Sequence, residues 1–273
     1  MSQVPHLNYG AISSSGFVLS LPDSTGMQSS LALLQKNYKF TKVFFWGKIT
    51  GTGGDYLIAM GIEESYTAKK FFYCQDGVTW AQLPAVTPEM MADAEKIAAP
   101  GLLLSGDPSK ETKLPPEPAP EGAEEGYEAP EKSIDEITRL AVMVMTIDME
   151  CAMLPAAALV KTPSGKVVDS PTFAGTDFAT ATALSSYVFV NKPKEVSVNA
   201  DAVTASTDFL TSCAEIVPGG ALVSKFDASI NVVCWRSLVY EGFVGYSLVG
   251  APMAGYCYIG SGQKNADIAF MLP

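Results

Sequence analysis

The segment from Thr41 to Ile62 limits the possible folds more than any other part of the chain, because two apolar runs flank the short sequence Gly-Thr-Gly-Gly. Glycine adopts the positive φ that a tight reversal needs, so this pattern predicts a β-hairpin. Strand alternation divides the first arm into Val43, Phe45, Gly47 and Ile49 on one face and Phe44, Trp46 and Lys48 on the other. It divides the second arm into Tyr56, Ile58, Met60 and Ile62 on one face and Leu57, Ala59 and Gly61 on the other. Because both faces are apolar, we expect the hairpin to be covered on both sides, by its own chain or by a partner.

The residues around this hairpin predict an antiparallel meander between two helices. Residues 41–83 contain four expected strands, with Asp76-Gly77 as the turn before the last of them at 78–80. Apolar residues recur at helical spacing from Met27 to Tyr38. A second helix is predicted to start at Thr87-Pro88-Glu89, since Thr is a favourable N-cap and Pro a favourable first helical residue.

The C-terminal half predicts a long helix followed by a second meander. Ser133 and Glu136 have the spacing of a capping box, and the helix after them presents Leu140 and Val144 on one stripe before Pro155 ends it. The elements expected next are a strand–turn–strand over 157–168, a helix over 176–184, an extended segment over 186–190, a short helix over 207–214 and four strands between 221 and 260. The expected fold class is α+β with predominantly antiparallel sheets.

An acidic, proline-rich linker separates the two halves. Residues 105–132 contain six prolines, eight acidic and three basic residues, and carry −5 of the formal net charge of −11. So few apolar side chains cannot offset the entropy of ordering, and we expect an extended, mobile segment. The expected organisation is therefore residues 1–104, the linker 105–132, and residues 133–273, with the first and last parts packing as one α+β unit.

Composition excludes several classes of function. Five widely spaced cysteines without a Cys-x-x-Cys motif argue against zinc and disulfides, and indicate free thiols in a reducing compartment. The net charge of −11 disfavours nucleic acid as a partner. Residues 242–263 are uncharged, but Gly250-Ala-Pro252 breaks the run, which favours strand–turn–strand over a membrane helix. The single histidine, His6, leaves no residues for most catalytic constellations, so we predict a protein without enzymatic activity, cofactor or metal.

Two alternatives stay open. One is a soluble module that binds a small molecule in a pocket lined by Met143, Met149 and Trp235. The other is an enzyme without histidine, for which Lys48 or Lys264 would be the reactive residue. A weak echo of Val43-x-x-Trp46 in Val232-x-x-Trp235 is interpreted as chance rather than as duplication.

Aromatic, arginine and C-terminal apolar residues are the candidates for contact with a partner protein. Trp, Tyr and Arg are the most frequent anchors at protein interfaces, and an apolar tail is expected to dock. The alternative for each residue taken alone is ordinary packing in a sheet core. The candidate interface residues are Phe44, Trp46, Trp235, Arg236, Tyr246, Tyr256, Tyr258, Ile268, Phe270 and Leu272.

Several segments resemble the radial spoke head protein 9 family of motile cilia and flagella. They are VFFWGKI, DYLIAMG, RLAVMVMTID, KTPSG, LSSYVF, and the run from WRSLVYEGFVGYSLV to GYCYIGSGQKNADIAFML. The resemblance extends from about residue 28 to the C-terminus and leaves the Pro/Glu-rich linker unassigned.

The resemblance implies a non-catalytic structural subunit of the axonemal radial spoke head, within the cytoskeleton of the cilium or flagellum. The implied partners are radial spoke head proteins of the 4/6 type and a MORN-repeat spoke-head subunit, and the head contacts the central-pair apparatus. The implied role is to help transmit central-pair signals toward the dyneins that drive motility. The expected mechanism is burial of the sheet faces and of the C-terminal tail against sister subunits.

Overall fold

A single eight-stranded sheet organises the chain, and it combines the two predicted meanders. The computed structural model describes residues 16, 19–97, 102–115, 132–194, 199, 201, 203 and 208–270. Within these residues the strand order is β11–β12–β13–β14–β1–β2–β3–β4. The strands are β1 (Lys42–Ile49), β2 (Tyr56–Ile62), β3 (Lys69–Cys74), β4 (Ala81–Gln82), β11 (Leu222–Asp227), β12 (Val232–Ser237), β13 (Phe243–Leu248) and β14 (Ala254–Gly260). All neighbours are antiparallel except β1 and β14, which join the two meanders in parallel. The predicted α+β class is confirmed.

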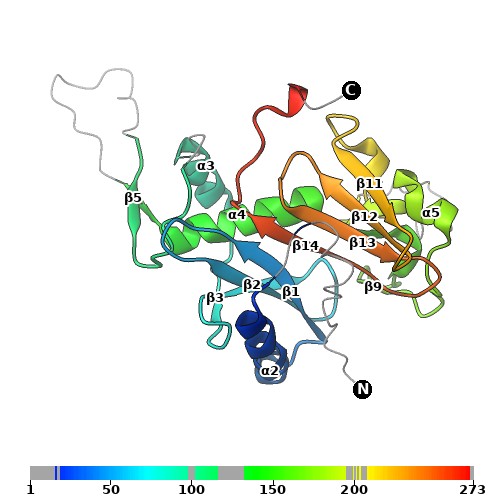
Figure 1. Ribbon diagram of the computed structural model, residues 1–273, viewed down its shortest axis with the longest axis horizontal. Helices are drawn as coiled ribbons and strands as arrows, with labels where there is room; N and C mark the ends of the chain where they lie inside the picture. Colours follow the sequence, from blue (N-terminus) through cyan, green and yellow to red (C-terminus); the bar gives the residue numbers. More distant parts are fainter. Residues whose placement is uncertain are drawn as a thin grey trace.

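Helices of the same chain cover one face of the sheet and the N-terminal half of the other face (Figure 1). α4 (Glu136–Cys151) runs across one face, where Trp46 and Tyr258 share a core with Val144. α2 (Leu21–Tyr38) covers the other face of the N-terminal half, where Phe45 packs in a second core with Leu31. The hairpin is covered on both sides as predicted, and of the two alternatives it is the chain itself that covers it. The expectation that these sheet faces are buried against sister subunits is therefore wrong for β1 and β2.

A β-bulge at Trp46 changes which residues of β1 share a face. Phe45 pairs with Ala59 and Gly47 with Ile58, so Trp46 is an extra residue in the strand. Ile49 consequently lies in the α4-side core rather than beside Phe45, which corrects the predicted alternation of this arm. Gly47 also permits the parallel junction, because a Cβ there would lie 2.0 Å from the main-chain oxygen of Tyr258 on β14.

The ends of several N-terminal elements differ from the prediction. α2 begins at Leu21, six residues before the predicted start, because Ser20 Oγ accepts a hydrogen bond from Asp23 N at 3.2 Å and caps the helix. β4 lies at 81–82 rather than 78–80, because Asp76 Oδ1 accepts hydrogen bonds from the amides of Val78 and Thr79 and extends the turn. α3 (Pro88–Ile97) starts where predicted.

The predicted capping box before α4 is wrong. Ser133 belongs to a strand, β6 (Ser133–Asp135), which pairs with β5 (Glu111–Lys113), and the N-cap residue of α4 is Asp135. Residues 105–115 of the predicted linker are therefore tied to the start of α4. Residues 116–131 of that linker lie outside the described residues.

The remaining elements lie between α4 and the C-terminal strands. They are β7 (Met153–Pro155) paired with β10 (Tyr187–Phe189), β8 (Leu159–Lys161) paired with β9 (Val167–Asp169), α5 (Phe178–Thr182), and the 3₁₀ turns η1 (Ala156–Ala158), η2 (Leu184–Ser186), η3 (Cys213–Glu215) and η4 (Ile268–Phe270). The predicted strand–turn–strand, helix and extended segment are confirmed. The helix predicted over 207–214 is replaced, in its described part, by the 3₁₀ turn η3.

The sequence regions that suggested other environments are ordinary parts of this fold. Residues 242–263 form β13 and β14, so the predicted strand–turn–strand is confirmed. No described helix combines the length and the apolar character needed to cross a membrane. All five cysteines are free and buried, as predicted for thiols that pack as small apolar groups.

Candidate functional site

The predicted interface residues do not form one surface. Trp46, Trp235, Tyr246 and Tyr258 are buried in the chain itself, with at most 9% exposure for any of them. Phe44, Arg236, Tyr256 and Ile268 are half-buried, Phe270 is 89% exposed, and Leu272 lies outside the described residues. Among the described residues of this set, Phe270 is the one whose side chain is largely accessible to a partner protein. The interface role of the set stays a prediction.

Instead, a buried carboxylate gathers polar groups from strands that are far apart in the sequence. Asp148 Oδ1, on α4, accepts hydrogen bonds from Trp46 Nε1 on β1 at 3.0 Å and from Tyr256 Oη on β14 at 3.1 Å. Its Oδ2 lies 2.5 Å from Nζ of Lys69 on β3. Lys69 Nζ also donates to the main-chain oxygen of Val190 at 3.0 Å. One carboxylate thus ties strands of both meanders to α4.

The Lys69–Asp148 pair is shielded from water, which makes the cluster rigid. Their side chains are only 7% and 4% exposed. Loss of one partner would leave an uncompensated charge in the core, which typically costs about 3–5 kcal/mol. Burial, followed by the charge of Asp148, raises the pKa of Tyr256 well above its ordinary value, so its hydroxyl remains a donor.

A second buried carboxylate, Glu136, holds the loop after α3. Its oxygens accept hydrogen bonds from Tyr56 Oη at 2.8 Å, Ser105 N at 2.9 Å, Ser105 Oγ at 2.5 Å and Gly106 N at 2.7 Å. Burial favours the protonated form, but the hydrogen bonds from Ser105, Tyr56 and Gly106 outweigh it and lower the pKa of Glu136. The ionised carboxylate therefore fixes this loop to β2 and to the start of α4.

The two carboxylates stand at the ends of one buried ridge of α4. Glu136, Leu140, Val144 and Asp148 are spaced four residues apart, and each is at most 3% exposed. Neither acid was predicted as a functional residue: Glu136 was assigned to a helix cap, and Asp148 was set aside because it cannot form a carboxylate pair with Glu150 on another face of the helix. The sequence did contain a feature that could have identified Asp148. It lies four residues after Val144, so the helical spacing places an acid on the apolar stripe of α4.

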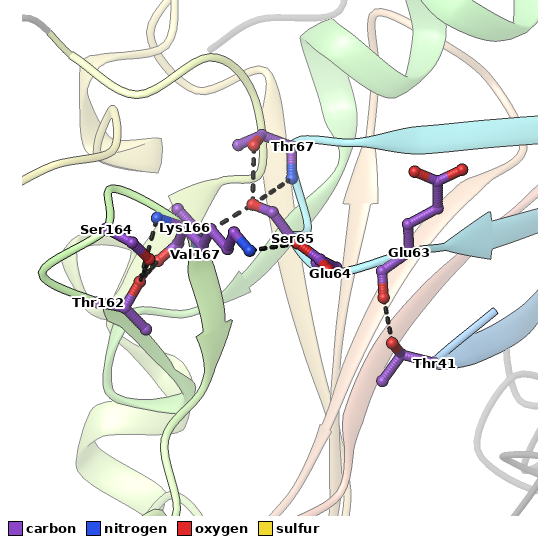
Figure 2. Close-up of polar contacts among 9 residues, drawn as sticks. All are labelled: Thr41, Glu63, Glu64, Ser65, Thr67, Thr162, Ser164, Lys166 and Val167. Carbon is purple, nitrogen blue, oxygen red and sulfur yellow. Dashed lines mark hydrogen bonds and ion pairs between the residues drawn. The ribbon is translucent and has the colours of Figure 1, made fainter.

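The β2–β3 turn is hydrogen-bonded to the β8–β9 hairpin at one corner of the sheet (Figure 2). Tyr66 N donates to Val167 O at 2.9 Å, and Val167 N donates to Ser65 Oγ at 3.1 Å. Lys166 and Glu64 form an ion pair beside these bonds, but their side chains are 46% and 72% exposed, so this pair contributes little. Hydrogen bonds between the two segments, including one from Tyr66 Oη to Asp169 Oδ1 at 2.6 Å, therefore contribute more than the exposed Lys166–Glu64 pair to fixing the β8–β9 hairpin beside the sheet.

The lysines of the histidine-free enzyme alternative are both engaged in ion pairs. Lys48 Nζ lies 2.6 Å from Asp55 Oδ2, and Lys264 Nζ lies 2.9 Å from Glu150 Oε2. Trp235, named for the small-molecule alternative, donates from Nε1 to the main-chain oxygen of Ala181 at 3.3 Å inside the core. Within the described residues, no group of three or more His, Cys, Asp or Glu side chains is placed to hold a metal ion.

Exposed apolar side chains gather at a place that the sequence did not predict. Phe226 on β11 is 39% exposed and packs edge-on against Phe178 of α5, which is 52% exposed. Val223, also on β11, is 48% exposed. The edge position of β11, not hydropathy, leaves Phe226 and, on the opposite face of the strand, Val223 open to solvent. That position can be recognised only when the strand order is known.

Comparison with known proteins gives a consistent result over nearly the whole chain. The chain is 34% identical to the radial spoke head protein 9 homolog of Danio rerio over 275 residues, which covers 98% of each protein. It is also 34% identical to the proteins of the same name from Bos taurus, over 268 residues, and Homo sapiens, over 269 residues, with 95% of each chain covered. No protein-family model matches the chain. Identity at this level and coverage, together with the segments quoted above, places the chain in the radial spoke head protein 9 family.

Proposed function

We propose that this chain is a non-catalytic structural subunit of the radial spoke head in the axoneme of a cilium or flagellum. It assembles there with radial spoke head proteins of the 4/6 type and with a MORN-repeat subunit, and the head contacts the central-pair apparatus. Its mechanical role is to help pass central-pair signals toward the dyneins. The observation that carries the proposal is the 34% identity, over 95–98% of the chain, to proteins named radial spoke head protein 9 homolog.

The internal contacts support a load-transmitting role. α4 is fastened to the sheet at both ends of its buried ridge, by Glu136 at one end and Asp148 at the other. The Asp148 cluster includes strands from both halves of the sheet, so a displacement of one half acts on the other through the same carboxylate. A tightly packed core of this kind transmits strain rather than absorbing it.

Reintroduction into ciliated cells that lack their own protein of this family tests the proposal. The tagged chain should remain with detergent-extracted axonemes, co-purify with sister spoke-head subunits, and restore beating. A chain that is extracted entirely by detergent, or that remains with axonemes without improving motility, would contradict the proposed role.

A purified system tests assembly separately. The chain should bind a purified 4/6-type subunit, and the Glu150→Gln variant, which loses an exposed ion pair, should bind equally well. The Asp148→Ala variant should bind less, in proportion to the fraction that is unfolded at the temperature of the measurement. A well-folded chain that ignores the 4/6-type subunit would argue against assembly.

A further inference from the structure

β11 is the edge strand of the sheet, and within the described residues its only strand neighbour is β12. Some of its main-chain groups point away from β12. Four consecutive residues of β11, 223–226, are exposed. Leu238 N donates to Ala221 O, so these residues form a hydrogen-bonded pair just before the strand. Bonded and non-bonded pairs alternate in an antiparallel ladder. The main-chain N–H and C=O groups of Leu222, Ser224 and Phe226 therefore point outward.

The opposite edge of the same sheet is protected, and β11 is not. β4 has two residues and is followed by Pro84, which cannot donate to a further strand. The part of β3 that β4 leaves uncovered carries Lys69 and Lys70. Such short strands, prolines and charges prevent edge-to-edge association. β11 is longer, has an uninterrupted register with β12, and contains one lysine and no proline.

The side chains on β11 match a second copy of the same strand. Residues that pair across two antiparallel strands point to the same face, so self-pairing must be centred on one residue. A register centred on Lys225 would oppose two lysines. A register centred on Phe226 places Lys225 opposite Asp227 twice and Phe226 opposite its own copy. This register satisfies both charges and buries the aromatic ring.

Neighbouring groups reinforce this register. The carboxylate of Asp227 is held at the strand end, where its Oδ1 accepts hydrogen bonds from Ser229 N at 3.0 Å and Ser229 Oγ at 2.6 Å. Phe178 lies 4.9 Å from Phe226 between ring centroids, so pairing about Phe226 would bring two such aromatic pairs together.

We propose that β11 is a self-association site at which a second copy of this chain adds its own β11 in antiparallel register about Phe226. Three residue pairs lie within the strands themselves, so the contact is small and the dimer is weak and reversible. In any assembly that holds two copies close together, a weak contact of this kind would suffice, because the effective concentration is high. The self-association site is independent of the function proposed above.

A charge exchange on the purified full chain tests the site. In the register about Phe226, position 225 of each copy faces position 227 of the other. Lys225→Asp would therefore place aspartate opposite aspartate at both of these pairs, and Asp227→Lys would place lysine opposite lysine at both. Each variant should raise the dissociation constant measured by sedimentation equilibrium at least about tenfold, because close like charges across an interface cost more than 1.4 kcal/mol. An equimolar mixture of the two variants should dimerise again, since each copy then opposes aspartates to lysines. Lys36→Asp, the same charge change on the exposed face of α2, should leave self-association unchanged.

Several outcomes would overturn the proposal. A wild-type chain that is monomeric at all concentrations up to the solubility limit would do so, as would a dimer that neither variant weakens. A dimer that both variants weaken and mixing does not restore would contradict the register about Phe226. Circular dichroism of each variant excludes misfolding as the cause. If the chain remains monomeric until a 4/6-type subunit is added, and the amides of β11 then become protected from hydrogen exchange, the edge accepts a strand of that subunit and not a second copy.

Discussion

The two halves of the sheet share strand order and direction but are held by different kinds of contact. β1–β2–β3 and β12–β13–β14 are both antiparallel three-stranded meanders, and the parallel contact of β14 with β1 sets them side by side in the same orientation. The first strand of each half directs a tryptophan into the α4-side core. Trp46 donates to the carboxylate of Asp148, whereas Trp235 donates to the main-chain oxygen of Ala181.

This difference extends through each half. The N-terminal half depends on both carboxylates of α4, since Glu136 accepts from Tyr56 and Asp148 pairs with Lys69. The C-terminal half contributes one bond to these clusters, from Tyr256 on the junction strand. A common arrangement of strands can therefore be stabilised by buried charge in one half and by neutral contacts in the other, and the two halves should respond differently to mutation and to acid.

The largest expected effect comes from removing the acid in the core. Asp148→Ala leaves the Lys69 ammonium buried without its partner and should lower the free energy of unfolding by about 3–5 kcal/mol. Urea denaturation measures the loss, with Glu150→Ala as the matched control, because Glu150 is paired with Lys264 at an exposed site and should cost under about 1 kcal/mol.

A double variant separates the loss of charge pairing from the loss of packing. Asp148→Leu combined with Lys69→Met removes both charges, and it should recover most of the stability lost in the single variant. Equal losses in Asp148→Ala and Glu150→Ala would show that the buried pair does not support the sheet.

The two tryptophans give a direct comparison of the halves. Trp46→Phe and Trp235→Phe remove the same atoms, but the first loses a hydrogen bond to a carboxylate and the second a bond to a neutral carbonyl. Hydrogen bonds to charged groups contribute about 1.5–3 kcal/mol and neutral ones about 0.5–1.5 kcal/mol, so Trp46→Phe should be the more destabilising by about 1 kcal/mol. Chemical denaturation of both variants checks the order, and the reverse order would contradict the assignment of charge to the N-terminal half.

Acid should weaken the N-terminal half through Glu136. Its pKa is lowered in the folded state, so its contribution is fully present above the unfolded pKa of about 4.3 and is lost as the pH falls through the lower, folded value. Glu136→Gln should cost about 2 kcal/mol at neutral pH, because an amide replaces one acceptor oxygen with a donor. The stability of wild type and variant should converge as the pH decreases below about 4.

Hydrogen exchange locates this effect in the molecule. As the pH falls, the amides of Ser105 and Gly106, which donate to Glu136, should lose protection before those of β12 and β13. Protection that is lost uniformly along the sheet would contradict the difference between the halves. A Glu136→Gln variant with the pH dependence of wild type would show that another group controls acid stability.

The sequence predicted elements well where apolar periodicity is local, and less well where a tertiary contact decides the outcome. Alternation in β2 was correct because Tyr56 and Ile58 follow a regular ladder. Alternation in β1 failed at Ile49, because the bulge at Trp46 depends on the partner strand and on the approach of Tyr258. Ser133 and Glu136 have the spacing of a capping box, but the pairing of β6 with β5 decides their roles.

The candidate site was harder to predict than the fold, because it consists of contacts between distant segments. Tryptophan and tyrosine were chosen as interface candidates, but the same aromatic character is typical of cores and of interfaces, and burial distinguishes the two only once the strands are assembled. The polar tip of Trp46 reaches Asp148 across 102 positions of sequence. The exposure of Phe226 likewise follows from the edge position of β11. Neither relation has a signature in local composition.

The smallest effect is expected from the acidic chain that connects the halves. Residues 116–131 contain one large apolar residue, Tyr127, whereas Ser105, earlier in the same acidic segment, is bonded to Glu136. The Leu114 amide bonds the main-chain oxygen of Lys132, so the two ends are already close and a four-residue Gly-Ser linker can replace 116–131. A shorter loop costs less closure entropy, and the free energy of unfolding should change by about 1 kcal/mol or less, in the stabilising direction.

A matched change within the same acidic segment makes this prediction sharp. Ser105→Pro removes both the main-chain and the hydroxyl donor of this residue to Glu136 and should destabilise the chain by about 2 kcal/mol or more, although it alters a single residue. Thermal denaturation of the two variants measures both effects. If the linker replacement destabilises the chain as much as Ser105→Pro, residues 116–131 make contacts that stabilise the fold. The contacts that support the N-terminal half would then extend into the connecting chain.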